Sequence, residues 1–100
     1  MFVNVYRRLV KINFKDIYLI ESNGNYINIK TKNSDIRVNN RLKNILEKLP
    51  QKHFIKIHKS FIININYIID IEDNSVLLNK QVIPISKKYR LDLNDRLNLL

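Results

Sequence analysis

The fold is decided by the stretch Phe54-Ile55-Lys56-Ile57-His58-Lys59-Ser60-Phe61-Ile62-Ile63-Asn64. Its two apolar runs are rich in Ile and Phe, which is typical of buried strands. The polar residues between them, His58 to Ser60, could not lie unpaired in a core. They are therefore expected at a strand end or on a loop that rigid apolar flanks present. Two interpretations remain open: a recognition loop, or an ordinary polar turn between two strands.

Length and composition restrict the class of protein. A chain of 100 residues, of which 45% are hydrophobic, is expected to form one globular domain with one modest core. The absence of Cys excludes disulfides, a Cys-based metal site and a thiol nucleophile, and two His are too few to indicate a zinc site. No apolar run is long enough to span a bilayer, and no signal peptide is recognisable. We expect a cytoplasmic, soluble protein without a cofactor or metal.

Charge is the most informative part of the composition. Eighteen Lys and Arg residues against nine Asp and Glu residues give a formal net charge of +9 and a pI near 9.9. A small domain this basic is expected to bind a polyanion, with nucleic acid as the first candidate and an anionic membrane surface as the second. A soluble basic protein that binds neither is the remaining alternative. Because neither predicted helix has a broad apolar face with aromatic anchors, we expect no membrane partner.

Hydrophobic patterning predicts a chain made mostly of strands. The predicted strands are Phe2–Val5, Tyr6–Ile12, Ile17–Ile20, Tyr26–Thr31, Asp35–Val38, Tyr67–Ile71, Val76–Leu78 and Gln81–Ile85. Polar residues 21–25 separate two of them, and Asn23-Gly24 is the strongest short signal for a hairpin turn. Asn79-Lys80 predicts a tight turn, and Pro84 indicates an edge strand or a strand end.

The pattern also predicts two helices. Asn39 or Asn40 can cap the first, and Pro50 ends it. Its apolar face, which we expect to pack on the sheet, consists of Leu42, Ile45, Leu46 and Leu49. Ser86 can cap the second. The apolar face of the second helix consists of Tyr89, Leu93, Leu97 and Leu100.

Lys87 and Lys88 fall in the first turn of the second helix, where the helix macrodipole disfavours cations. Either a bound anion offsets that cost, or the two side chains only solvate the helix start. The sequence has no motif for catalysis: its single Gly excludes a Gly-rich phosphate loop, and no catalytic constellation stands out. We therefore expect no enzyme. Helix-turn-helix, zinc-finger and basic-zipper patterns are absent too, so DNA contact would fall to loops or strands.

Four segments together resemble the LytTR-type DNA-binding domain of bacterial response regulators. They are residues 16–21 with Gly24-Asn25-Tyr26, the leucine helix ending at Leu49-Pro50, Phe54 to Asn64, and Ile83 to Tyr89. The resemblance implies a mainly β, LytTR-like fold of small successive antiparallel sheets with one or two short helices. It implies sequence-specific binding of double-stranded DNA by a transcription regulator of a two-component system. Loops would enter successive major grooves, and two copies would often bind direct repeats at promoters.

The resemblance places the DNA contacts in three loops. The residues that match the contacting positions and their neighbours are Ser22, Asn23, Asn25, His58, Lys59, Ser60, Lys87 and Lys88. The family often has Arg at the positions of Lys59 and Lys88, and Lys cannot make the planar bidentate contact to guanine. Phosphate binding is therefore the alternative role for both. For His58 we favour a structural role, holding its loop through a backbone hydrogen bond, over direct contact with DNA.

The resemblance covers residues 10–100, and residues 1–9 are expected to form an N-terminal extension or strand. Because such domains usually follow a receiver, sensor or membrane domain, the chain is either a fragment of a longer regulator or a stand-alone domain. The expected partners besides DNA are an upstream receiver or sensor domain, a partner protein, or a second copy of the chain.

A rival interpretation is a basic module that binds RNA or a protein without sequence-specific DNA binding. An RNA-binding sheet of the stacking type exposes several aromatic side chains. Tyr26, Phe61 and Tyr67 alternate with apolar residues and are expected to face the core, which argues against RNA.

Overall fold

The computed structural model describes residues 1–100 as ten strands and two α-helices. The strands are β1 (Phe2–Val5), β2 (Arg8–Lys11), β3 (Ile17–Asn23), β4 (Tyr26–Thr31), β5 (Asp35–Val38), β6 (Phe54–His58), β7 (Phe61–Asn64), β8 (Ile68–Glu72), β9 (Ser75–Leu78) and β10 (Gln81–Pro84). The helices are α1 (Leu42–Lys48) and α2 (Lys87–Arg96), with short 3-10 helices η1 (Phe14–Asp16) and η2 (Ile65–Tyr67). The predicted mainly β fold is confirmed.

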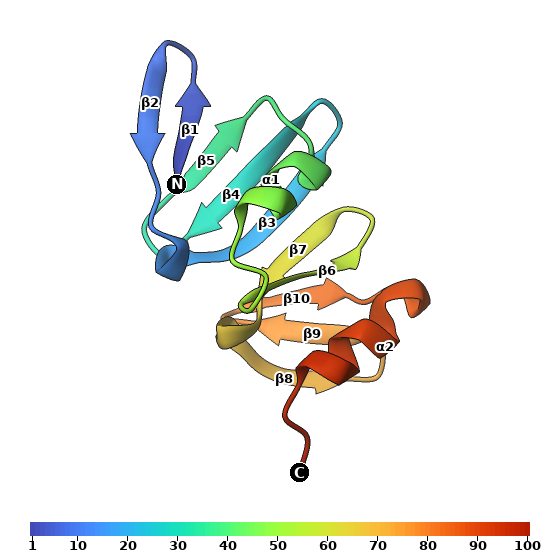
Figure 1. The fold of residues 1–100 in the computed structure, drawn as a ribbon. Helices are drawn as coiled ribbons and strands as arrows, with labels where there is room; N and C mark the ends of the chain where they lie inside the picture. The colour runs from blue at the N-terminus through green and yellow to red at the C-terminus, as the bar shows by residue number, and fades with distance from the viewer.

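The strands form three antiparallel sheets. A two-stranded sheet pairs β1 with β2, a central sheet has the order β5-β4-β3-β7-β6, and a third has the order β10-β9-β8. Figure 1 shows the two-stranded sheet at one end of the molecule and the three-stranded sheet with α2 at the other. The result is elongated, with extents of 46 × 24 × 23 Å.

Two apolar clusters replace the single core expected from the sequence. The α1 core contains Val3, Ile12, Ile17, Ile20, Ile27, Ile29, Val38, Leu42, Ile45, Leu49, Phe54 and Ile62. The α2 core contains Leu19, Ile55, Ile57, Ile63, Val76, Leu78, Ile83, Ile85 and Leu93. Successive side chains of a strand point to opposite faces, so β3 supplies Ile20 to one core and Leu19 to the other. Burial on both faces explains why this strand is a continuous apolar run.

The stretch Phe54 to Asn64 forms the hairpin of β6 and β7. His58 pairs with Phe61, so Lys59 and Ser60 make a two-residue turn. The register shifts between Lys56 and His58, which marks a bulge just before the turn. The prediction of two buried strands joined by polar residues at a strand end is confirmed.

The predicted strand Tyr6–Ile12 is wrong at its start. Val5 pairs with Arg8, so Tyr6 and Arg7 form a two-residue turn and β2 begins at Arg8. Tyr6 has a φ of 58° and is 97% exposed. Sequence propensity favoured a strand here because Tyr is β-prone, but the hairpin requires a positive φ at this position.

The predicted break at residues 21–25 is also displaced. β3 continues to Asn23, which pairs with Tyr26, so the turn consists of Gly24 and Asn25. Gly24, with a φ of 66°, supplies the positive φ at the first turn position, as in type II′ turns. Pairing of Glu21 with Phe61 on the neighbouring strand keeps β3 extended beyond its apolar run.

The start of β8 differs from the prediction as well. Residues 65–67 form η2, because the side chain of Asn64 accepts a hydrogen bond from the Asn66 amide at 3.0 Å. The strand therefore begins at Ile68 rather than at Tyr67. At the other end of this sheet, β10 is an edge strand, as Pro84 indicated.

The helix boundaries were partly predicted. α1 packs on the central sheet and ends just before Leu49-Pro50 as expected, but its N-cap is Arg41. Asn40 lies one residue earlier, where its Oδ1 accepts a hydrogen bond from the Arg41 amide at 2.8 Å. Ser86 is the N-cap residue of α2, but its hydroxyl makes no capping hydrogen bond. α2 ends at Arg96, so Leu100 is exposed and does not extend the apolar face.

Candidate nucleic-acid interface

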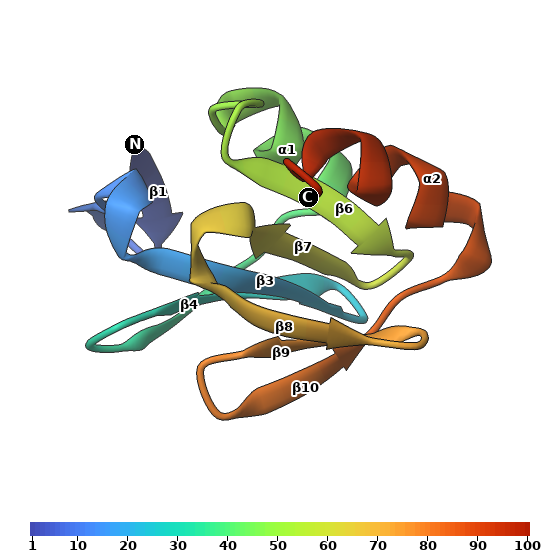
Figure 2. The ribbon, with the colours of Figure 1, turned by 90° about the horizontal axis from the view of Figure 1, so that it is seen from below.

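The three loops singled out from the sequence lie along one edge of the molecule. They are the β3–β4 turn at Gly24-Asn25, the β6–β7 turn at Lys59-Ser60, and the segment that enters α2 at Ser86. Figure 1 shows all three on the right-hand side, and Figure 2 shows them on the same side from below. This arrangement follows from the topology, because β3 and β7 are antiparallel neighbours whose turns project the same way.

One backbone hydrogen bond joins the first two loops. The Ser22 amide donates to the carbonyl oxygen of Ser60 at 2.8 Å. The bond extends the β3–β7 pairing by one step beyond Glu21 and Phe61. It holds the β6–β7 turn next to the β3–β4 turn, although Ser22 and Ser60 are almost 40 positions apart in the sequence.

A second backbone hydrogen bond joins the third loop to the same hairpin. The Ser86 amide donates to the carbonyl oxygen of Ile57 at 2.9 Å. Buried Ile85 and Leu93 hold the segment and α2 in the α2 core. Lys87 and Lys88 therefore lie near the β6–β7 turn, and both side chains are exposed to solvent.

His58 holds the middle turn in shape. Its Nδ1 accepts a hydrogen bond from the Ser60 amide at 3.1 Å, and its ring lies 5.2 Å from the Phe61 ring at an interplanar angle of 47°. The half-buried imidazole thus satisfies a backbone donor that the two-residue turn leaves free. Lys59, by contrast, is exposed and makes no such contact. These contacts give His58 a structural role in the β6–β7 turn.

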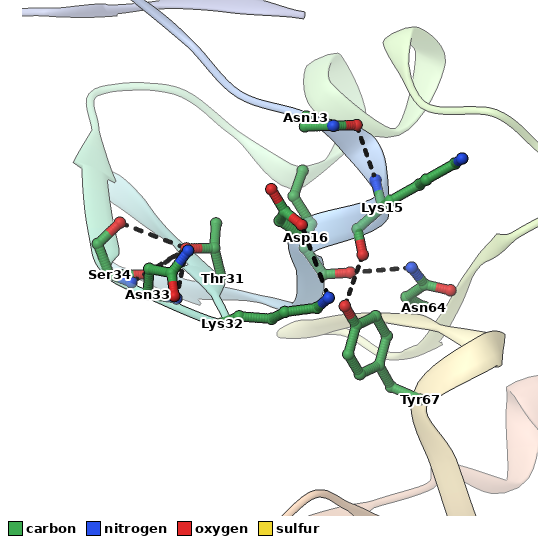
Figure 3. Close-up of polar contacts among 10 residues, drawn as sticks. Asn13, Lys15, Asp16, Thr31, Lys32, Asn33, Ser34, Asn64 and Tyr67 are labelled. Atoms are coloured by element: carbon green, nitrogen blue, oxygen red, sulfur yellow. Dashed lines mark hydrogen bonds and ion pairs between the residues drawn. The ribbon is translucent and has the colours of Figure 1, made fainter.

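The lysines at this edge form no ion pair with a carboxylate. Lys88 and Lys56 place their Nζ atoms 5.5 and 5.8 Å from the ring centroid of Tyr89. At such distances a cation–π attraction is weak and leaves the ammonium groups solvated. The one ion pair of the chain joins Lys32 and Asp16 at 3.9 Å (Figure 3). It lies beside the start of β3 and the end of β4, opposite the β3–β4 turn. The lysines of this edge are therefore free to meet an anionic ligand.

One basic residue beside this edge, Arg37, was not predicted from the sequence. Its Cζ lies 3.5 Å from the centroid of the Tyr26 ring, one residue beyond the β3–β4 turn. The expectation that Tyr26 faces the core is wrong, because the ring is only half-buried and lies under this guanidinium. Phe61 and Tyr67 are half-buried at the border of the α2 core. Only the register of β4 and β5 reveals the position of Arg37. Arg37 pairs with Asn28, which lies on the same face of β4 as Tyr26.

The polar residues at the opposite end have structural roles. Asn64 is 2% exposed and donates from Nδ2 to the carbonyl oxygen of Ile17 at 2.9 Å. Tyr67 donates its hydroxyl hydrogen to the carbonyl oxygen of Lys15, as Figure 3 shows. The two bonds join η1 and the start of β3 to the β7–η2 corner, from which the chain enters the three-stranded sheet.

The structure contains no cluster of His, Cys, Asp and Glu side chains suited to a metal ion. None of its helices is long and apolar enough to cross a membrane.

Known proteins resemble this chain over nearly its whole length. Sensory transduction protein LytT of Bacillus subtilis (strain 168) is 29% identical over 103 residues, covering 97% of this chain and 43% of LytT. LytT of Enterococcus faecalis (strain ATCC 700802 / V583) is 31% identical over 91 residues, covering 85% of this chain and 38% of that protein. The chain thus spans about two fifths of the length of these relatives.

Comparison with solved structures gives the same fold. A LytTr DNA-binding domain from Bacillus cereus matches with a TM-score of 0.82 at 21% identity, covering 99% of this chain and 96% of that one. The family model described as the LytTr DNA-binding domain matches residues 7–98. The resemblance stated from the sequence is confirmed, and the chain belongs to the LytTR family of DNA-binding domains.

Proposed function

We propose that this chain binds double-stranded DNA sequence-specifically, through the edge formed by its three loops, as the DNA-binding part of a transcription regulator. The observation that carries the proposal is the pair of backbone hydrogen bonds, Ser22 to Ser60 and Ser86 to Ile57. They gather polar and basic loops that are distant in the sequence into one preorganised surface. Ordering these loops before binding lowers the entropic cost of association.

Each loop contributes a different chemistry. The amide side chain of Asn25 at the first turn can pair bidentately with adenine in the major groove. Lys59 and Lys88 offer single ammonium groups, which suit phosphates or one guanine acceptor rather than a bidentate pair. Ser22, Asn23, Ser60 and Lys87 surround these tips and complete the proposed contact surface. His58 acts in this proposal by holding the middle turn.

The domain is long enough to lie along one turn of DNA. Its longest extent of 46 Å exceeds one turn of B-DNA, which is about 34 to 36 Å. In this proposal the loops of the edge enter successive major grooves, and two copies occupy direct repeats in a promoter. We further propose that residues 10–100 form the binding domain, that residues 1–9 extend it, and that a receiver or sensor domain controls it in the complete regulator.

Selection from random duplex DNA at physiological salt tests the proposal. We expect enrichment of a short motif that recurs as a direct repeat, because each of two bound copies would select the same bases. Recovery of sequences without any enriched motif would contradict sequence-specific binding and favour a basic module that recognises RNA or a protein.

A further inference from the structure

Arg37 is the one arginine whose side chain is fixed in place but has no hydrogen-bonding partner in the protein. Its guanidinium lies over Tyr26 at 3.5 Å, within the range of a strong cation–π contact. Arg90 and Arg96, by comparison, use their donors on the carbonyl oxygens of Asp73 and Gln51. Arg37 makes no ion pair, and its side chain is exposed.

The strand register places this guanidinium next to the proposed interface. β5 runs antiparallel to β4, with Val38 opposite Ile27 and Arg37 opposite Asn28. The end of β5 therefore lies at the same edge as the β3–β4 turn, and Tyr26 is the residue that follows Asn25. Figure 1 shows the tip of β5 beside the β3–β4 turn.

Stacking prepares Arg37 for an anion. A guanidinium held flat on an aromatic ring keeps its N–H groups in the plane, and their outer edge remains free to donate in a fork. Tyr26 thus restricts a flexible side chain before any ligand arrives, which reduces the rotamer entropy lost on binding. Glu21 and Asp35 share this face of the sheet, but neither pairs with Arg37.

We infer that Arg37, positioned by Tyr26, is a further DNA contact that grips a phosphate of the duplex beside the groove entered by the β3–β4 turn. The inference rests on the proposed function. It also supplies the fork-shaped donor that Lys59 and Lys88 lack. The ligand group is a phosphodiester, whose two non-bridging oxygens accept a pair of parallel hydrogen bonds from a planar guanidinium.

Binding of the selected duplex by matched variants tests the inference. Arg37→Gln should weaken binding about tenfold, the effect of losing one charge-assisted contact, and should reduce the slope of log K against log salt by about 1. Arg7→Gln is the control, because it removes the same charge from the β1–β2 turn, which lies away from the three loops (Figure 2). It should leave the salt slope unchanged.

Two further variants separate positioning from charge. Arg37→Lys should keep the salt slope but not the full affinity, because an ammonium group cannot stack flat or donate in a fork. Tyr26→Leu should weaken binding in the wild-type background, but should add little to Arg37→Gln, since the two side chains act as one unit. If the two residues served folding alone, the variants would lower the melting temperature. The salt slope would then stay unchanged, and the two effects on DNA affinity would not be coupled.

If Arg37→Gln kept the affinity and the salt slope of the wild type, the inference would be overturned, but the proposed function would not. Failure of the unmodified chain to bind any duplex would overturn the proposed function and the inference together.

Discussion

Lys59 and Lys88 are exposed, and neither forms an ion pair in the structure. Lys59→Ala and Lys88→Ala should therefore change the free energy of unfolding by less than about 0.5 kcal/mol. If each ammonium contacts a base, each change should cost about 1 to 3 kcal/mol of binding and relax the preference at one position of the site. Binding titrations on the selected duplex and on single-base variants measure both effects.

Phosphate contact gives a different outcome for the same variants. All duplexes should then be weakened alike, and the salt slope should fall by about 1 per Lys. Lys80→Ala is the control, because Lys80 is an exposed residue of the β9–β10 turn at the far side of the molecule (Figure 2). Unchanged binding by both loop variants, on selected and random duplexes, would show that DNA contacts another face.

His58 is expected to affect stability and binding together. His58→Ala removes the acceptor of the Ser60 amide and the ring contact with Phe61. Losing one hydrogen bond of about 1 kcal/mol should lower the melting temperature of a domain this size by roughly 4 to 8 °C. DNA affinity should fall because the Lys59 turn loses its shape. Thermal unfolding and binding titration of one preparation test this, and weaker binding at an unchanged melting temperature would place the imidazole on the DNA.

At the scale of elements, Asn64 fixes the corner between the central sheet and η2. Its side chain donates to the carbonyl oxygen of Ile17 and accepts from the Asn66 amide, while it is 2% exposed. Asn64→Ala removes the partner of the carbonyl oxygen of Ile17 at a buried site, which should cost about 1 to 3 kcal/mol. Urea unfolding measures the loss.

A matched change provides the control for this element. Asn33→Ala alters an exposed side chain of the β4–β5 turn and should stay within about 0.5 kcal/mol of the wild type. Well below the unfolding transition, Asn64→Ala should still bind DNA, because the corner lies opposite the three loops. An equal loss of stability in both variants would contradict the role assigned to Asn64.

Elements buried on two sides were the easiest to predict from the sequence. The runs Ile17–Ile20 and Phe61–Ile63 are apolar because both faces of β3 and β7 are covered, and the structure has strands there. Turn positions were harder, since pairing with a distant strand decides them. Glu21 remains extended because Phe61, 40 residues later in the chain, pairs with it. Tyr6 adopts a positive φ because Val5 pairs with Arg8.

The candidate site was predictable to a similar degree. Motifs around Asn25, Lys59 and Lys88 located three loops, but not the hydrogen bonds that join them. Arg37 was not predicted because its contact with Tyr26 depends on the register of β4 and β5. Amino-acid composition does not indicate which residues of two strands pair.

At the scale of the whole molecule, we expect net charge to set the strength of DNA binding. The formal net charge is +9, and the proposed edge is free of ion pairs. If about four to six phosphates are neutralised, log K should fall with log salt at a slope of roughly −4 to −5. Titrations at several salt concentrations give this slope. A slope near zero would contradict an electrostatic interface of this kind.

Amide chemical-shift mapping shows which face of the domain contacts DNA, and we expect that face to be the edge of the three loops. The ¹⁵N-labelled chain is titrated with a duplex that it binds, and each backbone amide is followed. The account predicts the largest shifts at residues 22–25, 58–60 and 86–88, with residues 6–8 and 79–80 unchanged. Shifts centred on the β1–β2 or β9–β10 turn, with the three loops unaffected, would contradict it.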